Sequence, residues 1–181
     1  MFEIRVDDNI LLQVPRQDQA GELFALVKDN YERLHEWMTW CNEDYSLASA
    51  AEFIDSAQAV SEQDAGLALI IIVDGKIAGG IGVHNVSLQD RSAESGYWIG
   101  EKYAGKGIVT RSANELLDHA FNVMQMNRMA IKCAPENLRS RAVAERLGFV
   151  LEGTKREASR LHDRFVDHVV YSMLAKEWKG K

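Results

Sequence analysis

The stretch that decides the fold runs Ser95-Gly-Tyr-Trp-Ile99, then Gly100-Glu-Lys-Tyr-Ala-Gly-Lys-Gly-Ile108, then Val109-Thr-Arg-Ser-Ala-Asn-Glu-Leu-Leu-Asp-His-Ala-Phe121. The first segment is rich in aromatic and β-branched residues, which favours a strand. The last segment carries apolar residues at three- and four-residue spacing, which favours a helix. Between them lies a loop with two glycines. The stretch therefore predicts a strand, a glycine turn and a helix N-terminus in succession.

Such a turn can bind an anion. The backbone N–H groups of the first helical turn have no partner within the helix, and the helix dipole favours negative charge there. Gly105 and Gly107 have no Cβ that would hold a phosphate away from the backbone, and Lys102, Lys106 and Arg111 add positive charge. A plain turn would have the same spelling. The loop is neither a Walker loop nor a dinucleotide fingerprint, because it lacks the Gly-Lys-Ser/Thr ending of the first and the third glycine of the second.

Composition predicts one domain over residues 1–181. No apolar run is long enough to span a bilayer, and the N-terminus lacks a signal pattern, so we expect no membrane association. Cys41 and Cys133 are far apart and lack metal-ligand spacing, which indicates reduced thiols in a cytoplasmic protein and no metal site. The formal charge of -6 argues against nucleic-acid binding and is compatible with an amine or a basic peptide as partner.

The rest of the chain alternates between strand and helix patterns. Asp18 and Asn137 are predicted helix N-caps, and Gly148 a helix C-terminal glycine. Strands are predicted at 10–14, 67–73, 76–86, 93–99, 128–134, 149–161 and 165–174, and helices at 19–30, 31–40, about 46–63, 111–121 and after 137. This order predicts an α+β domain with a mixed sheet.

Against this background, Lys102-Tyr-Ala-Gly-Lys-Gly107 resembles the Gln/Arg-x-x-Gly-x-Gly/Ala segment of the GNAT N-acetyltransferase superfamily, with Lys102 where Gln or Arg is usual. The element order matches over nearly the whole chain. The resemblance implies the GNAT fold: a single mixed, mostly antiparallel sheet with a central splayed strand pair, flanked by helices on both faces. It also implies acetyl-CoA as co-substrate, with its pyrophosphate on this loop.

A second match is Asn137-Leu-Arg-Ser140 followed by Leu147-Gly-Phe149. It implies that Asn137 contacts the pantetheine or adenosine arm, a role that can coexist with an N-cap. Many family members carry a tyrosine on this helix that protonates the leaving thiolate, but the corresponding position here is Ala144. By resemblance, the residues expected to bind the co-substrate are Tyr97, Trp98, Ile99, Lys102, Ala104, Gly105, Lys106, Gly107, Ile108 and Asn137.

Within the superfamily, Asn137-Leu-Arg-Ser140, Gly96-Tyr-Trp-Ile99 and Leu34-x-x-Trp37-x-x-Trp40 resemble the RimL/RimJ type. Enzymes of that type acetylate the N-terminal α-amine of a ribosomal protein, so such a protein is the expected partner. Two alternatives stay open: an acetyltransferase for a small amine such as a polyamine or aminoglycoside, and a non-catalytic acyl-CoA-binding module. The resemblance is also compatible with a homodimer.

Catalysis requires a proton acceptor for the amine and a partner for the leaving thiolate. Glu94 is the candidate base, because it lies on the strand beside the thioester, although it could equally be a solvated strand carboxylate. Ser140 is the candidate partner of the thiolate by resemblance, or else a first-turn residue that satisfies the backbone. The residues expected to contact the acceptor are Trp37, Trp40, His84 and Asn85, with core packing and a hydrogen-bonded structural histidine as the alternatives.

Overall fold

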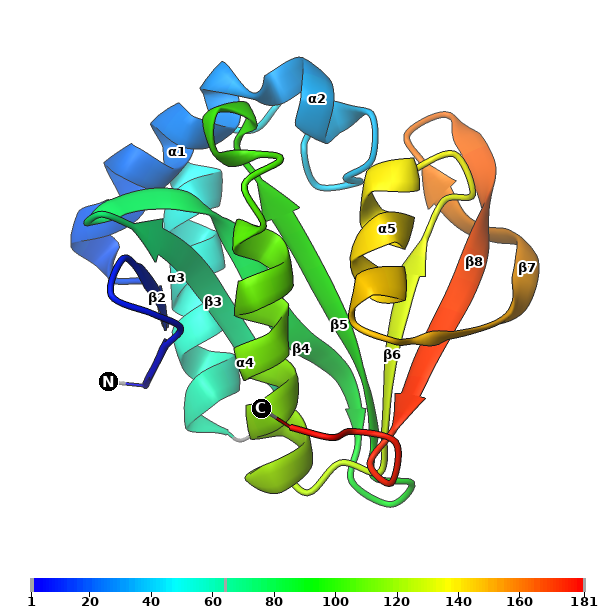
Figure 1. Cartoon of the computed structure of the whole chain (residues 1–181). Coiled ribbons are helices and arrows are strands. Elements are labelled where there is room, and N and C mark those ends of the chain that lie inside the picture. Colours follow the sequence, from blue (N-terminus) through cyan, green and yellow to red (C-terminus); the bar gives the residue numbers. More distant parts are fainter. Residues whose placement is uncertain (1, 64, 181) are drawn as a thin grey trace.

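A computed structural model describes residues 2–63 and 65–180. Its strands form one eight-stranded sheet in the order β1-β2-β3-β4-β5-β6-β8-β7. The helices pack on both faces of this sheet (Figure 1). The strands are β1 Glu3–Arg5, β2 Ile10–Gln13, β3 Leu67–Val73, β4 Lys76–Ser87, β5 Ser92–Ile99, β6 Arg128–Cys133, β7 Val150–Leu161 and β8 Arg164–Leu174; the helices are α1 Ala20–Asp29, α2 Tyr31–His35, α3 Leu47–Glu62, α4 Ile108–Asn122 and α5 Leu138–Arg146.

The sheet is antiparallel everywhere except at its centre. β5 and β6 run parallel and pair only from Ser92 with Arg128 to Glu94 with Ala130. Beyond these residues the two strands diverge, as Figure 1 shows. This gap between β5 and β6, called the β5–β6 gap below, confirms the predicted splayed pair and the α+β GNAT-type sheet.

Two apolar clusters hold the helices on opposite faces. Leu116, Leu117 and other apolar residues of α4 pack on one side of the sheet, together with Ala144 of α5. Leu23 of α1 and Ile54 of α3 pack on the other side. In Figure 1, α4 and α5 accordingly lie in front of the sheet, with α1 and α3 behind it.

The chain turns where the sequence predicts a break between two strands, and the predicted cap and C-terminal glycine of α5 are present. Asp74 and Gly75 join β3 to β4 with φ values of 49° and 75°. Asn137 caps α5 by accepting a hydrogen bond from the Ser140 backbone N–H at 3.1 Å. Gly148 follows α5 with φ of 82°, a left-handed conformation that glycine adopts without strain.

Two expectations need correction, and one strand was not predicted. The helix predicted over 31–40 ends at His35, and the chain then turns back through Trp37, whose N–H donates to the Leu34 carbonyl at 3.1 Å. Asp18 does not cap α1, because its carboxylate pairs with Arg16 and a short 3-10 turn precedes the helix. β1 was not predicted.

Among the described residues, no helix is long and apolar enough to cross a membrane.

Candidate active site

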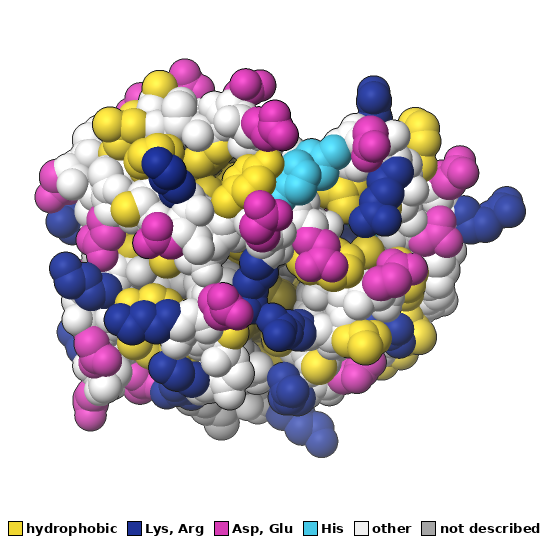
Figure 2. Space-filling model, turned by 90° about the horizontal axis from the view of Figure 1, so that it is seen from above, with side chains coloured by type: hydrophobic (Ala, Val, Ile, Leu, Met, Phe, Trp, Pro, Cys, Tyr) yellow, Lys and Arg dark blue, Asp and Glu magenta, His cyan; other side chains and the backbone are white. Residues whose placement is uncertain are grey.

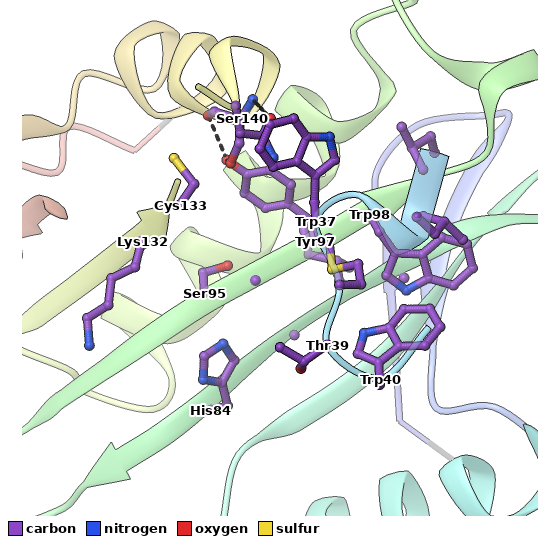
Figure 3. A pocket seen from close by; sticks show the side chains of 18 of the residues that line it. Trp37, Thr39, Trp40, His84, Ser95, Tyr97, Trp98, Lys132, Cys133 and Ser140 are labelled. Atoms are coloured by element: carbon purple, nitrogen blue, oxygen red, sulfur yellow. Dashed lines mark hydrogen bonds between the residues drawn. The ribbon is translucent and has the colours of Figure 1, made fainter. Parts of the chain in front are cut away.

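A cavity of about 1380 Å³ opens at the β5–β6 gap. β4, β5, β6, α5, the segment after α2 and the β7–β8 hairpin contribute to its walls. Successive side chains of a strand point to opposite faces, so Ser95 and Tyr97 face α4 and α5, and Gly96 and Trp98 face α1 and α3. The cavity therefore has a wall on each side of the sheet (Figure 3).

The glycine loop, residues 100–107, leads from β5 into α4. Gly105 and Gly107 have φ values of 74° and 71°, and no atom lies within 4 Å of the position that a Cβ would take at either residue. Within the described part of the chain, the backbone N–H groups of residues 105–110 donate to no carbonyl, since the first bond of α4 runs from Arg111 N–H to the Gly107 carbonyl. Six consecutive free donors beside open space fit the pyrophosphate of a coenzyme A group.

The side chains of the loop do not all face this cavity. Lys102, Lys106 and Ile108 line a separate hollow of about 720 Å³ together with Asp7 and Arg111, which form an ion pair. Ala104, Gly105 and Gly107 line neither hollow, whereas Ile99 and Val109 line the main cavity. The loop therefore joins the main cavity at its two ends, Ile99 and Val109, whereas the side chains of Lys102 and Lys106 lie at the separate hollow.

The N-terminus of α5 brings Ser140 to Tyr97. The Tyr97 hydroxyl donates to the Ser140 carbonyl at 3.0 Å, and the Ser140 hydroxyl donates to Tyr97 Oη at 3.2 Å (Figure 3). Burial raises the pKa of Tyr97, and the hydrogen bond from Ser140 opposes this only in part. Ala144 is fully buried in the core, so the α5 position at which many family members carry tyrosine holds no acid here.

Two further residues of this wall were missed by sequence reasoning. Ser95 is only 4% exposed, and its Oγ has no hydrogen-bond partner among the described residues. Cys133 on β6 is buried in the wall, and burial raises the pKa of its thiol. An unpaired buried hydroxyl is costly unless a ligand satisfies it, so Ser95 also fits a cavity that takes up a polar arm.

Glu94, the candidate base, is not among the residues that line the cavity. Its carboxylate forms an ion pair with Lys132, whose side chain does line the cavity. His84 and Asn85 line the cavity, and both are exposed. The β4–β5 register is regular from Gly79 to His84 and shifts only after that residue.

Aromatic side chains form the wall behind β5. Trp37 and Trp40 line the cavity. The Trp40 ring lies 5.8 Å from that of Trp98 and 5.7 Å from that of Tyr45, and Trp40 remains 40% exposed. The aromatic residues predicted for acceptor binding therefore lie at the site, with Trp40 open to solvent.

A pair of histidines joins α2 to the β7–β8 hairpin, next in sequence to the cavity-lining residues Leu34 and Leu161. His35 at the end of α2 stacks on His162 in the β7–β8 turn, with ring centroids 3.8 Å apart. His162 Nε2 also lies 2.8 Å from the His35 carbonyl oxygen. Figure 2 shows histidine side chains between the two lobes of this face. The contact holds α2 against the hairpin.

Metal binding has no support in the described residues, since no group of three or more His, Cys, Asp or Glu side chains there could hold an ion.

Comparison with known proteins places this geometry in a family. Residues 9–150 match the family model described as an acetyltransferase (GNAT) domain. The chain is 34% identical to the "Putative ribosomal N-acetyltransferase YdaF" of Bacillus subtilis over the full length of both, and 25% identical to the ribosomal-protein-serine acetyltransferase of Escherichia coli over 94% of this chain and 96% of that one. Among solved structures, it is similar to the microcin C7 self-immunity acetyltransferase MccE in complex with acetyl-CoA and AMP, with a TM-score of 0.89 and 31% identity over 94% of this chain and 95% of that one.

Proposed function

Because the chain belongs to the GNAT acetyltransferase family and is an acetyl-CoA-dependent N-acetyltransferase, we propose that its acceptor is the N-terminal α-amine of a ribosomal protein. The observation that carries this proposal is the character of the cavity wall. Its charged lining residues are Arg33, Glu36, Lys132, Glu136 and Arg139, which are three cations against two anions. A polyamine would need a predominantly acidic wall, whereas a peptide end with a single amine would not.

The chemistry of the amine agrees with this choice. An α-amino group titrates near 7.7–8.0, so roughly 10–17% of it is neutral at pH 7. A lysine-like amine with a pKa near 10.4 is neutral in only about 0.04% of molecules at that pH. Glu94 is held by Lys132 and does not line the cavity. A weak base is sufficient for an α-amine, so this acceptor does not require the Glu94 carboxylate.

Acetyl-CoA supplies the activated acetyl thioester. We assign its pyrophosphate to the free N–H groups of residues 105–110 and its pantetheine arm to the β5–β6 gap, beside Asn137. Alternate backbone groups of residues 95–99 face this gap, because β5 has no β6 partner beyond Glu94. One N–H near Tyr97, Trp98 or Ile99 is the donor for the oxyanion, a contribution of roughly 3–4 kcal/mol when preorganised. The buried Ser95 hydroxyl can donate to the same arm.

The leaving thiolate is assigned to Ser140. Its hydroxyl is part of the hydrogen-bonded pair with Tyr97 at the cavity wall. A serine hydroxyl is a poor acid, so we assign it a hydrogen-bonding role. Its single proton is donated to Tyr97 Oη, so the hydroxyl turns from Tyr97 to the sulfur when the thiolate forms. Tyr97 and Ser140 together take the role that a tyrosine has in many family members at the position of Ala144, which is to stabilise the leaving thiolate.

A second candidate acceptor is a small amine carried on an aromatic ring system. MccE was solved with AMP as well as acetyl-CoA. In this chain Trp40, Trp98 and Tyr45 form an aromatic wall, and such a wall can stack a nucleobase. The non-catalytic alternative is set aside by the family assignment.

The deciding experiment incubates the protein with acetyl-CoA and dissociated ribosomal proteins and measures intact masses. We expect one acetyl group on a single protein, mapped to its N-terminal residue. The Trp40→Ala variant should raise the KM for this acceptor and leave that for acetyl-CoA unchanged. If no ribosomal protein gains mass while an amine on a nucleotide does, the second candidate replaces the first.

The same proposal places the enzyme in the cytoplasm, where its substrates are. A homodimer stays a prediction. The feature that bears on it is the edge strand β7, on which Val150 and Leu151 are exposed.

A further inference from the structure

A row of polar side chains crosses the face of the sheet that carries Trp98. His84 on β4 lies directly opposite Glu94 on β5. Glu94 is paired in turn with Ala130 on β6. Residues two apart on a strand point to the same face, so Lys132 lies on this face and reaches Glu94 in an ion pair. The row thus begins at His84 and continues through Glu94 and Lys132.

The row ends on β8. Lys132 is opposite Val170, and His168, two residues earlier on β8, shares that face. His168 Nε2 lies 3.0 Å from the Ser159 hydroxyl of β7. Both residues line the cavity. The imidazole of His168 is therefore already engaged within the protein through one nitrogen.

His84 is placed differently. Its Nε2 lies 3.0 Å from the position that a Cβ would take on Gly96, so the ring lies over the β5 backbone at a residue where any side chain would crowd it. The β4–β5 register shifts directly after His84, and Asn85 adopts φ of 52°. Such irregularities re-aim side chains at sites. Among the described residues, no hydrogen bond reaches either ring nitrogen of His84, and the residue is exposed at the cavity.

The surroundings favour the neutral form of this imidazole. Partial desolvation by the surrounding protein lowers the pKa of His84, Glu94 raises it, and Lys132 lowers it again, so the net direction is downward from 6.5. A histidine with a lowered pKa is neutral at pH 7 and can accept a proton. His168 is shifted in the same direction, by burial first and then by Lys132.

We infer that His84 is the catalytic base that takes the proton from the attacking amine. The amine nitrogen forms a bond to the thioester carbonyl carbon, and His84 accepts one proton from that nitrogen. The carbon–sulfur bond then breaks and its electron pair leaves on the coenzyme A sulfur. The imidazolium returns its proton to solvent through the open mouth of the cavity. This inference rests on the proposed function only in requiring an amine acceptor, ribosomal or not.

The neighbours of His84 are less suited to the role. The Glu94 carboxylate is paired with Lys132 and lies outside the cavity lining. His168 is bonded to Ser159 and lies on β8, beyond β6 from the strand that would hold the thioester. His84 is the member of the row whose ring lies over β5 itself, at Gly96.

The test uses His84→Gln and His84→Ala in the full-length protein, with His119→Gln as the matched control. His119 is a histidine on α4 that packs on Phe2, and burial lowers its pKa as well. Two reactions are followed: acetyl transfer to ribosomal proteins, and the slow hydrolysis of acetyl-CoA, in which water takes the place of the amine. Hydrolysis has no titrating acceptor, so its pH profile isolates the titration of the enzyme.

We expect His84→Gln to lower kcat of both reactions about 100-fold, within the range of general-base catalysis, with unchanged acetyl-CoA affinity. The acidic limb of the wild-type hydrolysis profile, at a pKa below 6.5, should disappear. Added imidazole should restore activity to His84→Ala and should leave the activity of the wild type unchanged. His119→Gln should match wild type.

Two results would overturn the inference: kcat of His84→Gln within threefold of wild type, or an acidic limb that survives the substitution. The absence of acetyl transfer to any ribosomal protein is a separate outcome. If wild type acetylates no ribosomal protein but hydrolysis still depends on His84 as described, the proposed acceptor is wrong and the base assignment stands.

Discussion

A glycine at the start of α4 has two possible reasons: the left-handed backbone conformation of Gly107, and the open space that it leaves beside the free N–H groups. Replacing Gly107 with alanine would separate them. Gly107 has φ of 71°, and no atom lies within 4 Å of the position that its Cβ would take. The cost is therefore conformational rather than steric. An L-residue in the left-handed region costs about 1–2 kcal/mol, and the restricted unfolded chain of the alanine variant offsets about 0.4–1 kcal/mol of this. We expect the free energy of unfolding to fall by about 1 kcal/mol.

Gly21→Ala is the matched control. Gly21 is the second residue of α1, and its Cβ position is equally open, but alanine there gains up to about 0.5–1 kcal/mol because glycine has a lower helix propensity than alanine. For a chain of this length, 1 kcal/mol corresponds to about 2–4 °C in Tm. The Tm should fall by that amount in Gly107→Ala and rise by a similar or smaller amount in Gly21→Ala, as measured by thermal unfolding without ligand.

The second measurement is calorimetric titration with coenzyme A. The Cβ of Gly107→Ala projects into open space at the free N–H groups assigned to the pyrophosphate, so we expect about tenfold weaker binding, or about 1.4 kcal/mol. Gly21→Ala should bind as wild type does. A lower Tm with unchanged coenzyme A affinity would refute the assignment of the pyrophosphate to this loop. An unchanged Tm would refute the conformational reason for the glycine.

Three further substitutions test separate parts of the structure. Ser140→Ala should lower kcat about tenfold and leave acetyl-CoA affinity unchanged, in steady-state kinetics and titration; unchanged kcat would remove Ser140 from the mechanism. The hydrogen bonds from Arg128 lower the pKa of Glu152 to about 2, so Glu152→Gln should cost about 1 kcal/mol of stability at pH 7, after discounting for solvent screening. Because a lowered pKa stabilises only above it, that difference should fade as pH falls from 4.5 towards 2 in denaturant titrations, and a constant difference would contradict the ion-pair explanation. His162→Ala removes the stack on His35, worth about 0.5–1.5 kcal/mol, and should raise the acceptor KM about 2- to 13-fold without changing that of acetyl-CoA; equal effects on both would indicate general damage.

Most of the fold could be predicted because local pattern and tertiary structure agree. The Asp74-Gly75 turn, the period of α4 and the cap at Asn137 each specify their element within a few residues. β1 has three residues and is held by pairing with β2 and by packing of Phe2 and Ile4 on the core. No local signal specifies such a strand. The helix predicted over 31–40 stops early for a similar reason: tertiary contacts turn its second half back into the cavity wall.

The site could be predicted only where its residues follow one another in the chain. The glycine loop and the Asn137-to-Ser140 segment are local motifs, and family resemblance gave them a chemical meaning. By contrast, Ser140 and Tyr97 are 43 positions apart, and His162 and His35 are 127 apart. Their contacts arise from the order of strands in the sheet, which no spacing in the sequence reveals.

Strand β5 explains how one site can separate its two substrates. Its even-numbered residues Glu94, Gly96 and Trp98 share the face of the aromatic wall and the polar row, and Ser95 and Tyr97 share the face of α5. Under the proposed function, the thiol end of acetyl-CoA leaves toward Ser140 on one face, and the amine approaches from the other. A solvent-filled gap between the strands would leave the thioester open to water from both sides. The β5–β6 gap begins beyond the last paired residues, Glu94 and Ala130, and under the proposed function the pantetheine arm fills it. Under the proposed function, the base for this amine lies on the even-numbered face, as His84 does, and Tyr97 and Ser140 on the odd-numbered face serve the leaving group.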